Sequence, residues 1–347
     1  MQNIYFYAPN EIDRKVIQED HTQWTGYHSN FMAWIAQSYF YLKQAGLPCQ
    51  ITEQIPDEGI LIADRNTLAE DYPFLDRVML ICAKSDQEYH PSAHIHIVYN
   101  FFNWYRDRNT IRNPYLLNHW PIPGLISRNK ERLSTVENIA YIGTKSQLVP
   151  ELNSKTWTDA LTSLGCNWSP VWDRTQWNNY SQLDVIVAIR RFEPQAYLNK
   201  GPLKLINAWL AGVPIIVNSE SGILAHQRND LDFIIVNSLE EAIQAVEQLK
   251  NHPELYHEMI ANGFERVKEY TLQPTLKQWL DFFKNIVYPT YEEWKKLSKT
   301  QKRILFIRRY FDFRYHRAKA RLTKQDYEIG TLKEFLEIQK QYQLAKS

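Results

Sequence analysis

The chain is poor in cysteine and has no long hydrophobic run. Its three cysteines among 347 residues, Cys49, Cys82 and Cys166, are odd in number, far apart and without metal-ligand spacing. They indicate buried thiols in a reducing compartment rather than a disulfide framework. The longest apolar runs, such as Val78–Ala83 and Val185–Ile189, fall far below the roughly 18 residues of a membrane-spanning helix. The sequence therefore argues against a disulfide scaffold and against a spanning protein.

Signals for export and for a metal are also absent. The opening Met-Gln-Asn-Ile-Tyr-Phe-Tyr has no basic stretch before an apolar segment, so we expect no secretory signal and a cytoplasmic protein. His94 and His96 share one face of a strand, but no cysteine or carboxylate stands near them as a further ligand. We therefore expect no metal site and no resident cofactor.

The composition is that of a globular protein, with 44% hydrophobic and 23% charged residues. At roughly 150 residues per domain, the length suggests two domains. The apolar strand Ile4–Tyr7 opens the first half and a polar loop of about twenty residues follows it. A helix then carries Phe31, Ile35, Tyr39 and Leu42 at helical spacing. This order predicts a β-α-β unit.

Strands and helices alternate in both halves of the chain. The further strands expected in the first half are Cys49–Thr52, Ile60–Ala63, Val78–Cys82 and His94–Tyr99. A stretch rich in Pro, Arg and Asn from 120 to 137 is interpreted as an interdomain connection. In the second half we expect strands at Ile139–Ile142, Val185–Ile189, Pro214–Val217 and Phe233–Val236, and helices at Thr156–Leu164, Lys204–Ala211, Glu240–Lys250, Pro253–Tyr270 and Thr275–Ile286. The pattern predicts an α/β fold of two Rossmann-like, doubly wound domains, at 1–132 and 138–286, with a helical extension at 287–347.

Positive charge is concentrated near the C-terminus. The net charge is +1, yet residues 295–324 hold 12 Lys or Arg against the single acid Asp312, while the rest holds 28 basic and 38 acidic residues. Ile304, Ile307 and Phe311 recur at helical spacing among the basic residues. We expect a basic amphipathic helix that contacts an anionic membrane surface. The alternative is a solvated helix packed on the first domain. Nucleic-acid binding is not expected, because no binding module accompanies the charge.

Candidate ligand-binding groups follow the expected strand Val185–Ile189, at the carboxyl edge where open α/β sheets bind ligands. Arg190 comes directly after this strand. Gly201-Pro202 then starts a helix, with Lys200 beside its first residue and Lys204 in its first turn. Free N–H groups and the positive dipole end suit a phosphate, and a bound anion would remove the conflict between the dipole and the lysines.

A second group of candidates follows the next strand. Ser219, Glu220, Ser221 and Gly222 are expected at the same edge of the sheet. An acid with hydroxyls suits a sugar or a ribose, so the rim combines groups for a pyrophosphate with groups for a sugar. The alternative interpretation is a set of surface lysines and a plain turn with a helix cap.

The segment Lys204-Leu-Ile-Asn-Ala-Trp-Leu-Ala-Gly-Val-Pro-Ile-Ile-Val resembles the donor-site segment of GT-B glycosyltransferases, close in style to the glycosyltransferase 4-like families. The resemblance covers residues 138 to about 286, and the first half matches only in architecture. It implies two domains facing across a cleft. It also implies a hexosyltransferase-type enzyme of polysaccharide biosynthesis. The basic segment near the C-terminus would place that enzyme peripherally at the inner face of the membrane. Such an enzyme moves a sugar from a UDP- or GDP-sugar to a glycan or lipid-linked acceptor.

The resemblance also implies roles for single residues. Arg190 and Lys204 would neutralise the diphosphate, and Asn207 and Glu220 would contact ribose or sugar. Retaining members often carry two glutamates eight positions apart, and the matching positions here are Asn199 and Asn207. This departure leaves open a second hypothesis, a catalytically silent relative that binds nucleotide or glycan as a partner or scaffold.

The acceptor side is expected on the long polar loop before the first predicted helix. Loops of this length in compact domains are usually functional or mobile. His21 or His28 is the candidate base toward an acceptor hydroxyl, and Trp24, Gly26 and Tyr27 are the candidate acceptor contacts, since aromatic rings stack on sugar faces. For either histidine the alternative is a surface or hydrogen-bonded residue.

Overall fold

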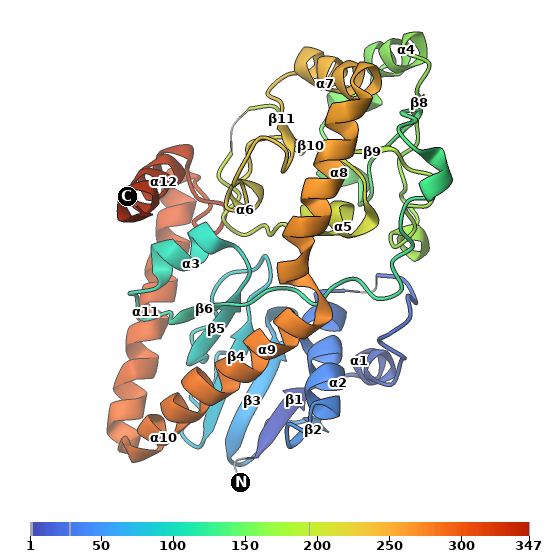
Figure 1. Cartoon of the computed structure of the whole chain (residues 1–347). Helices are drawn as coiled ribbons and strands as arrows, with labels where there is room; N and C mark the ends of the chain where they lie inside the picture. The colour runs from blue at the N-terminus through green and yellow to red at the C-terminus, as the bar shows by residue number, and fades with distance from the viewer. Residues whose placement is uncertain (1–2, 28, 194, 347) are drawn as a thin grey trace.

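The computed structural model of the chain describes residues 3–27, 29–193 and 195–346, with side chains as far as residue 341. The chain forms two β-sheets, one above the other in Figure 1, with helices around each. The first sheet has the strand order β2-β1-β3-β4-β5-β6 and the second β11-β10-β9-β7-β8, and every strand pairing in both is parallel. The predicted α/β class with two Rossmann-like domains is confirmed.

The strands are short, and the central ones are apolar throughout. The strands of the first sheet are Ile4–Tyr7 (β1), Cys49–Thr52 (β2), Gly59–Asp64 (β3), Val78–Ala83 (β4), Ile95–Val98 (β5) and Pro114–Leu116 (β6). Those of the second are Asn138–Ala140 (β7), Asn167–Trp168 (β8), Val185–Ala188 (β9), Ile215–Val217 (β10) and Ile234–Ile235 (β11). Strands β3, β4, β5, β9 and β10 are buried at every position, as parallel strands covered on both faces should be. In both sheets the strand order reverses beside the first strand, between β1 and β3 and between β7 and β9. Ligands bind at such switch points.

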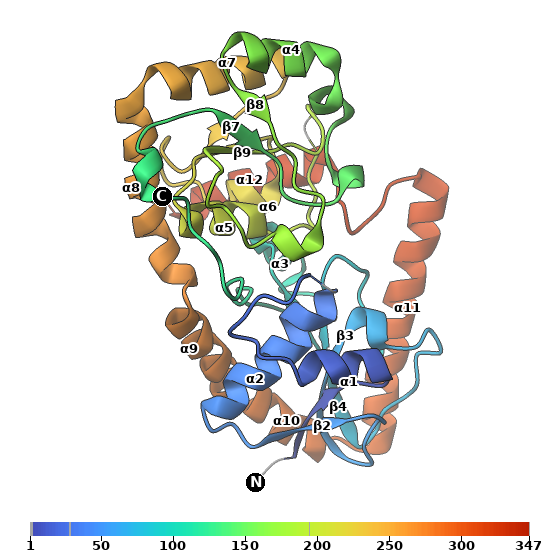
Figure 2. The ribbon, with the colours of Figure 1, turned by 90° about the vertical axis from the view of Figure 1, so that its right-hand side faces the viewer.

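Helices surround both sheets and connect them (Figures 1 and 2). Their bounds are Glu11–Ile17 (α1), Gln37–Gln44 (α2), Phe101–Asp107 (α3), Lys155–Ser163 (α4), Leu203–Ala211 (α5), Ser221–Leu224 (α6), Leu239–Asn251 (α7), Pro253–Val267 (α8), Leu272–Phe282 (α9), Tyr288–Lys296 (α10), Lys299–Thr323 (α11) and Leu332–Lys346 (α12). π-Helical turns precede α2 at Met32–Ala36 and α10 at Phe283–Val287. No described helix combines the length and the apolar character that crossing a bilayer demands.

Three elements of the first domain were not predicted from the sequence. The expected polar loop contains α1, where the Asn10 side chain accepts the Asp13 N–H at 2.9 Å and so caps the helix. Helix α3 is capped in the same way by Asn100, and β6 follows it as the edge strand of the sheet. All three elements are seven residues or shorter, which is too short for a hydrophobic period to be read.

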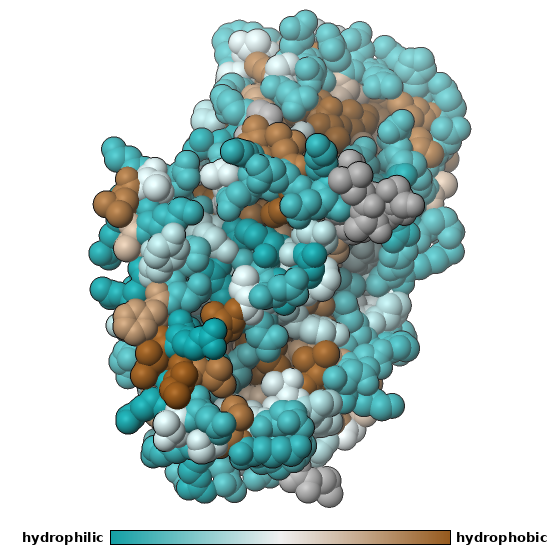
Figure 3. All heavy atoms as spheres, turned by 90° about the vertical axis from the view of Figure 1, so that its left-hand side faces the viewer, coloured by the Kyte–Doolittle hydropathy of each residue, from teal (hydrophilic) through white to brown (hydrophobic). Residues whose placement is uncertain are grey.

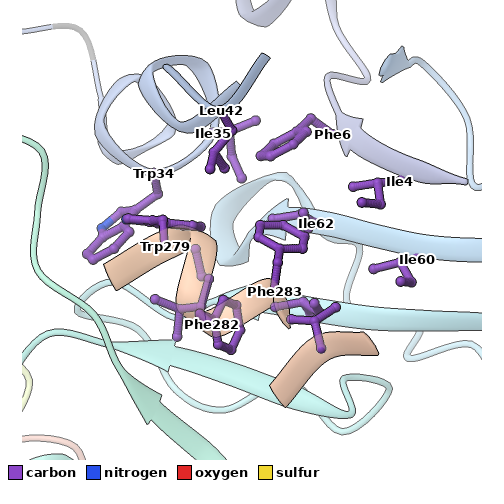
Figure 4. Packing of buried hydrophobic residues seen from close by; sticks show 14 of the residues in the cluster. Ile4, Phe6, Trp34, Ile35, Leu42, Ile60, Ile62, Trp279, Phe282 and Phe283 are labelled. Carbon is purple, nitrogen blue, oxygen red and sulfur yellow. The ribbon is translucent and has the colours of Figure 1, made fainter. Parts of the chain in front are cut away.

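The chain returns from the second domain to the first through its C-terminal helices. Helix α8 runs down beside the second sheet and leads into α9 (Figure 1). Figure 4 shows Trp279, Phe282 and Phe283 of this return segment packed against Trp34 and Ile62, and all five residues are at most 1% exposed. The segment that we assigned to the second domain up to residue 286 therefore supplies part of the core of the first.

The connection between the domains is fastened at one buried carboxylate. Asp184, which precedes β9, is fully buried and accepts hydrogen bonds from Arg128 at 2.8 Å and Arg132 at 2.7 Å. It also accepts the backbone N–H groups of Glu137 and Asn138 at 3.0 and 2.8 Å. Burial alone would raise the pKa of Asp184, but these donors hold it below its ordinary value. The irregular stretch expected as a connection thus has a fixed course.

Helix α11 lies along the first domain, and the chain beyond it reaches the second. One face of α11 contacts the first domain through Lys302, Arg309 and Arg317. In α12, Phe335 packs in a small cluster that contains Phe102 of the first domain and residues of the second. The packing on the first domain, which was the alternative given for the basic helix, is therefore present on one face of α11.

Candidate functional site

A cavity of about 410 Å³ lies between the two sheets, with walls from both domains. On the second-domain side it meets Gly143, which follows β7, and Arg190, which follows β9. These two strands flank the switch point of the second sheet, so the cavity stands where open α/β sheets bind ligands. On the first-domain side it meets residues that follow β4, β5 and β6, namely Asp86, Tyr99 and His119.

Arg190 is held in place by an acid behind it. Its backbone N–H donates to Asn218 Oδ1 at 3.2 Å, and its guanidinium lies 2.9 Å from the carboxylate of Glu220 and also contacts Gln147. Burial alone would lower the pKa of Arg190, but the attraction of Glu220 raises it. Arg190 is therefore a fixed cation at the cavity wall, and Glu220 partly neutralises its positive charge.

Lys204 is a half-buried basic side chain that lines the cavity. It lies in the first turn of α5, and its Nζ is 3.4 Å from the hydroxyl of Tyr141 and 4.8 Å from the centre of that ring. Within the described part of the chain, no carboxylate makes an ion pair with it. Burial, and next the nearby charge of Arg190, lower the pKa of Lys204 to about 7. An anion placed beside Nζ would reverse this effect.

Lys200 also lines the cavity, but its charge is shared with the first domain. Its Nζ lies 2.6 Å from Asp86, and its backbone carbonyl accepts a hydrogen bond from Asn100 at 2.7 Å. Beside it, a Cβ on Gly201 would stand 1.9 Å from the Tyr99 ring, so only glycine fits there. Burial alone would raise the pKa of Asp86. The hydrogen bond and charge of Lys200 outweigh this effect and lower the pKa, so the carboxylate is ionised. This segment joins the domains at the floor of the cavity.

The two asparagines at the positions of the family glutamates have different surroundings. The amide of Asn199 donates to the backbone carbonyl of Asp86 at 3.1 Å, so it takes part in the junction between the domains. Asn207, on α5, lines the cavity, and its buried Oδ1 has no hydrogen-bond partner among the described residues. It is a free acceptor for a ligand hydroxyl.

The four candidate residues that follow β10, at positions 219–222, lie behind the cavity wall and do not form its surface. Glu220 is engaged with Arg190, and the Ser221 hydroxyl accepts from Asn100 at 2.8 Å. A Cβ on Gly222 would come within 2.3 Å of the Lys200 carbonyl. Neither these three residues nor Ser219 lines the main cavity. Strand β10 stands one strand farther from the switch point, so the residues after it support the rim instead of forming its surface.

The loop before α2 reaches across to the second domain. The indole N–H of Trp24 donates to the Thr175 carbonyl at 2.8 Å, and Gly26 backs onto the same residue. Tyr27 stacks on Trp177 with ring centres 5.5 Å apart, and burial raises its pKa to about 12. Trp24, Tyr27 and Trp177 line the cavity and provide flat apolar surfaces, while Gly26 stands outside the lining.

The histidine that the structure places at the cavity is not one of the two that were expected there. His21 is 1% exposed, packs edge-on to Phe40 at 5.5 Å and does not line the cavity, so it cannot reach a ligand there. Burial lowers its pKa despite the nearby acids. His28 lies outside the described residues. Among the described residues, the histidine that lines the cavity is His119, whose ring centre lies 4.2 Å from that of Trp34 and 4.8 Å from that of Tyr99. Its buried Nδ1 has no hydrogen-bond partner within the described chain.

Burial also lowers the pKa of His119 to about 3, so its ring is neutral. His119 was not predicted as a site residue because it follows β6, a strand that was itself not predicted. Asp86 was also missed, although it follows the predicted strand at Val78–Cys82 and could have been found by the rule that placed Arg190. In the described ranges, no set of three or more His, Cys, Asp or Glu is arranged to hold a metal ion.

Comparison with known proteins gives a family for the second domain and a fold for the whole. Residues 144–281 match the model of a family described as glycosyl transferase-like. No curated protein matches the chain. Among solved structures, it is similar to sucrose-phosphate synthase from Thermosynechococcus elongatus, with 12% identity and a TM-score of 0.54 over 83% of this chain and 100% of that one.

Two further structures share the architecture. The pneumococcal O-GlcNAc transferase GtfA, in complex with UDP and GlcNAc, is 12% identical with a TM-score of 0.50, over 73% of this chain and 60% of that chain. Anabaena HepE, in complex with UDP-glucose, is 10% identical with a TM-score of 0.50, over 82% of this chain and 100% of that one. The chain therefore has the fold of the GT-B glycosyltransferases, and its second domain matches the glycosyl transferase-like family.

Proposed function

We propose that the protein transfers a sugar from a nucleoside diphosphate sugar, UDP- or GDP-linked, to the hydroxyl of a glycan or lipid-linked acceptor. We extend the proposal to a hexosyltransferase of polysaccharide biosynthesis that works in the cytoplasm, at the inner face of a membrane. The donor would lie against the second domain and the acceptor against the first. Fold relatives solved with UDP or UDP-glucose support a uridine nucleotide as the first donor to test.

The observation that carries the proposal is that Lys204 lines the cavity without an ion pair to any described carboxylate. A lysine at a helix N-terminus, half-buried and beside Arg190, is electrostatically unfavourable while no acid accompanies it. A diphosphate would supply that missing negative charge, and the free N–H groups at the start of α5 would add hydrogen bonds to it. Asn207, with its unpartnered Oδ1, would accept a hydrogen bond from a ribose or sugar hydroxyl.

The chemistry required of these residues is stabilisation of a leaving group. In the transfer, the bond between the anomeric carbon and the diphosphate oxygen breaks, and a bond from that carbon to the acceptor oxygen forms. The acceptor proton leaves to the released diphosphate or to solvent. Negative charge gathers on the diphosphate as its bond breaks. Arg190, and Lys204 once the diphosphate favours its protonated form, are placed to stabilise that charge. Binding and catalysis would thus use the same two residues.

The acceptor would enter from the first-domain side of the cavity. Trp24 and Tyr27 offer ring surfaces to a sugar, and the ionised Asp86 offers an acceptor for its hydroxyl hydrogens. The neutral His119 contributes a free ring nitrogen beside them. We assign it to hydrogen bonding with the transferred sugar or the acceptor.

Incubation of the pure protein with UDP-, GDP- and dTDP-sugars, with and without glycan acceptors, tests the function. The proposal expects nucleotide release that depends on one donor and that falls in Lys204→Met. Exposed Lys145, which is close in sequence to the cavity residue Gly143, provides the matched control Lys145→Met with unchanged release. Tight nucleotide binding with no turnover of any donor would instead favour the silent relative as the function of this chain.

A further inference from the structure

One face of α11 carries an apolar stripe that no other part of the described chain covers. Ile304, Ile307, Phe311, Tyr315 and Leu322 follow one another at steps of three, four, four and seven residues, so they lie on one side of the helix. All five are exposed, Phe311 by 68% and Leu322 by 85%. Figure 3 shows brown, apolar atoms among teal ones on the side of the molecule where α11 lies. The stripe is large for a surface that meets only water.

Basic side chains without ion-pair partners border the stripe. At 3.6 residues per turn, Arg308 and Lys319 fall along one edge of it, and Arg314 and Arg321 fall along the other. All four are exposed, and no acid pairs with any of them in the described part of the chain. The one acid of α11, Asp312, is half-buried and bonded to Arg112 at 2.8 Å. The exposed face is therefore apolar along its middle and purely positive at its edges.

The opposite face fixes the helix in place. Lys302 donates to the Asp76 carbonyl at 2.9 Å, Arg309 to the Pro91 carbonyl at 3.0 Å, and Arg317 to Glu88 at 2.9 Å. Lys299, which forms an ion pair with Asp76 at 2.8 Å, and Arg303, which lies over the Phe74 ring, hold the same side of the molecule. Among the described residues, the four outer basic residues make no such contact with the first domain, so they are not needed to hold the helix. The 25-residue helix is thus formed and oriented before it meets a partner.

We infer that the outer face of α11 is a docking surface for an anionic lipid bilayer, with the helix lying in the plane of the headgroups. A bilayer meets both parts of the face, since its acyl boundary covers the apolar stripe and its phosphates meet the arginines and lysines. Nucleic acid would leave the stripe in water, and a second copy would bring like charges together. The inference rests on the proposed function only for its purpose, which is to hold the cleft near a membrane-bound acceptor.

Co-sedimentation with vesicles tests the surface without any donor or acceptor. The full chain should pellet with vesicles of phosphatidylcholine and phosphatidylglycerol, less at high salt, and not with phosphatidylcholine alone. Replacing the four outer basic residues by Gln (R308Q/R314Q/K319Q/R321Q) should weaken binding at least tenfold, since each charge near the surface is worth a factor of roughly five. Phe311→Ser with Leu322→Ser should weaken it as well.

The control removes the same charge elsewhere. Four exposed lysines on other elements, replaced in K130Q/K155Q/K268Q/K277Q, should leave vesicle binding unchanged. No pelleting of the native chain, an equal loss in this control, or full binding by the Ser variant would overturn the inference. So would tighter binding to a DNA duplex than to the vesicles. Because sugar transfer is measured separately on soluble acceptors, vesicle binding without turnover would refute only the proposed function, and turnover without vesicle binding would refute only the docking surface.

Discussion

Binding of a nucleoside diphosphate should depend on pH through Lys204. The pKa of this lysine, lowered from 10.5 to about 7 by burial and by Arg190, leaves it half protonated at neutral pH. A diphosphate beside Nζ favours the charged form and moves the pKa back up. The complex therefore takes up a proton at Lys204, and affinity must fall as the pH rises above 7.

The structure sets the size of this effect. If the pKa of Lys204 returns to its ordinary value in the complex, the dissociation constant for UDP rises about 50-fold between pH 7 and pH 9, because the protonated fraction of the free lysine falls from about one half to about one hundredth. The neighbouring groups do not titrate in this window. The pKa of Tyr141 is raised to about 12, that of His119 is lowered to about 3, and the last pKa of a phosphate monoester is about 6.

Calorimetric titration of UDP at pH 7, 8 and 9 measures the affinity and the proton uptake together when buffers of different ionisation enthalpy are compared. Lys204→Met should bind UDP more weakly at pH 7 and show almost no change up to pH 9. Lys145→Met should keep the slope of the native protein. A flat profile for the native protein, or an equal slope in Lys204→Met, would refute the assignment of the diphosphate to this lysine.

Three other substitutions follow from the same structure. His119→Phe removes the unpartnered ring nitrogen from the cavity, so the rate of sugar transfer should fall on the order of tenfold while UDP affinity stays unchanged. The control His21→Phe should leave the transfer rate unchanged. Equal rates of nucleotide release in the two variants would contradict this role of His119. Asp184→Asn breaks buried ion pairs and should lower the free energy of unfolding in urea by about 3–5 kcal/mol; a loss below about 1 kcal/mol would show that the connection is held otherwise. Because the pKa of Asp184 is lowered in the fold, its contribution should be complete above its ordinary pKa of 3.8 and be lost as the pH falls through the folded value. Trp24→Phe keeps a ring but loses the bond to Thr175, so the acceptor KM should rise severalfold; an unchanged KM would remove Trp24 from the acceptor side.

The fold was largely predictable because buried parallel strands leave a plain signal. Runs such as Val78–Ala83 and Val185–Ala188 are apolar at every position, since both faces of the strand are covered. Short elements with mixed composition gave no such signal. Helix α1 has only seven residues and begins at the Asn10 cap. Helix α9 has the hydrophobic period of a helix, but nothing in its sequence indicates the domain on which it packs.

The candidate site was predictable on the side where chemistry follows a recognised strand. Arg190 and Lys204 do line one cavity, as the edge rule for α/β sheets requires. Partners from the other domain could not be read from the sequence. That Lys200 pairs with Asp86, 114 positions away, depends on how the two sheets face each other. The burial of His21 depends on α1 and α2 closing over it, and local composition contains no trace of that packing.

A crystal structure of the protein with bound UDP shows directly whether the rim at Arg190 and Lys204 holds a diphosphate. Both phosphates should lie in the cavity between the sheets, at the start of α5, within hydrogen-bond distance of Arg190 and Lys204. If UDP binds elsewhere on the chain, or in this cavity with its phosphates turned away from both residues, the rim is not a diphosphate site.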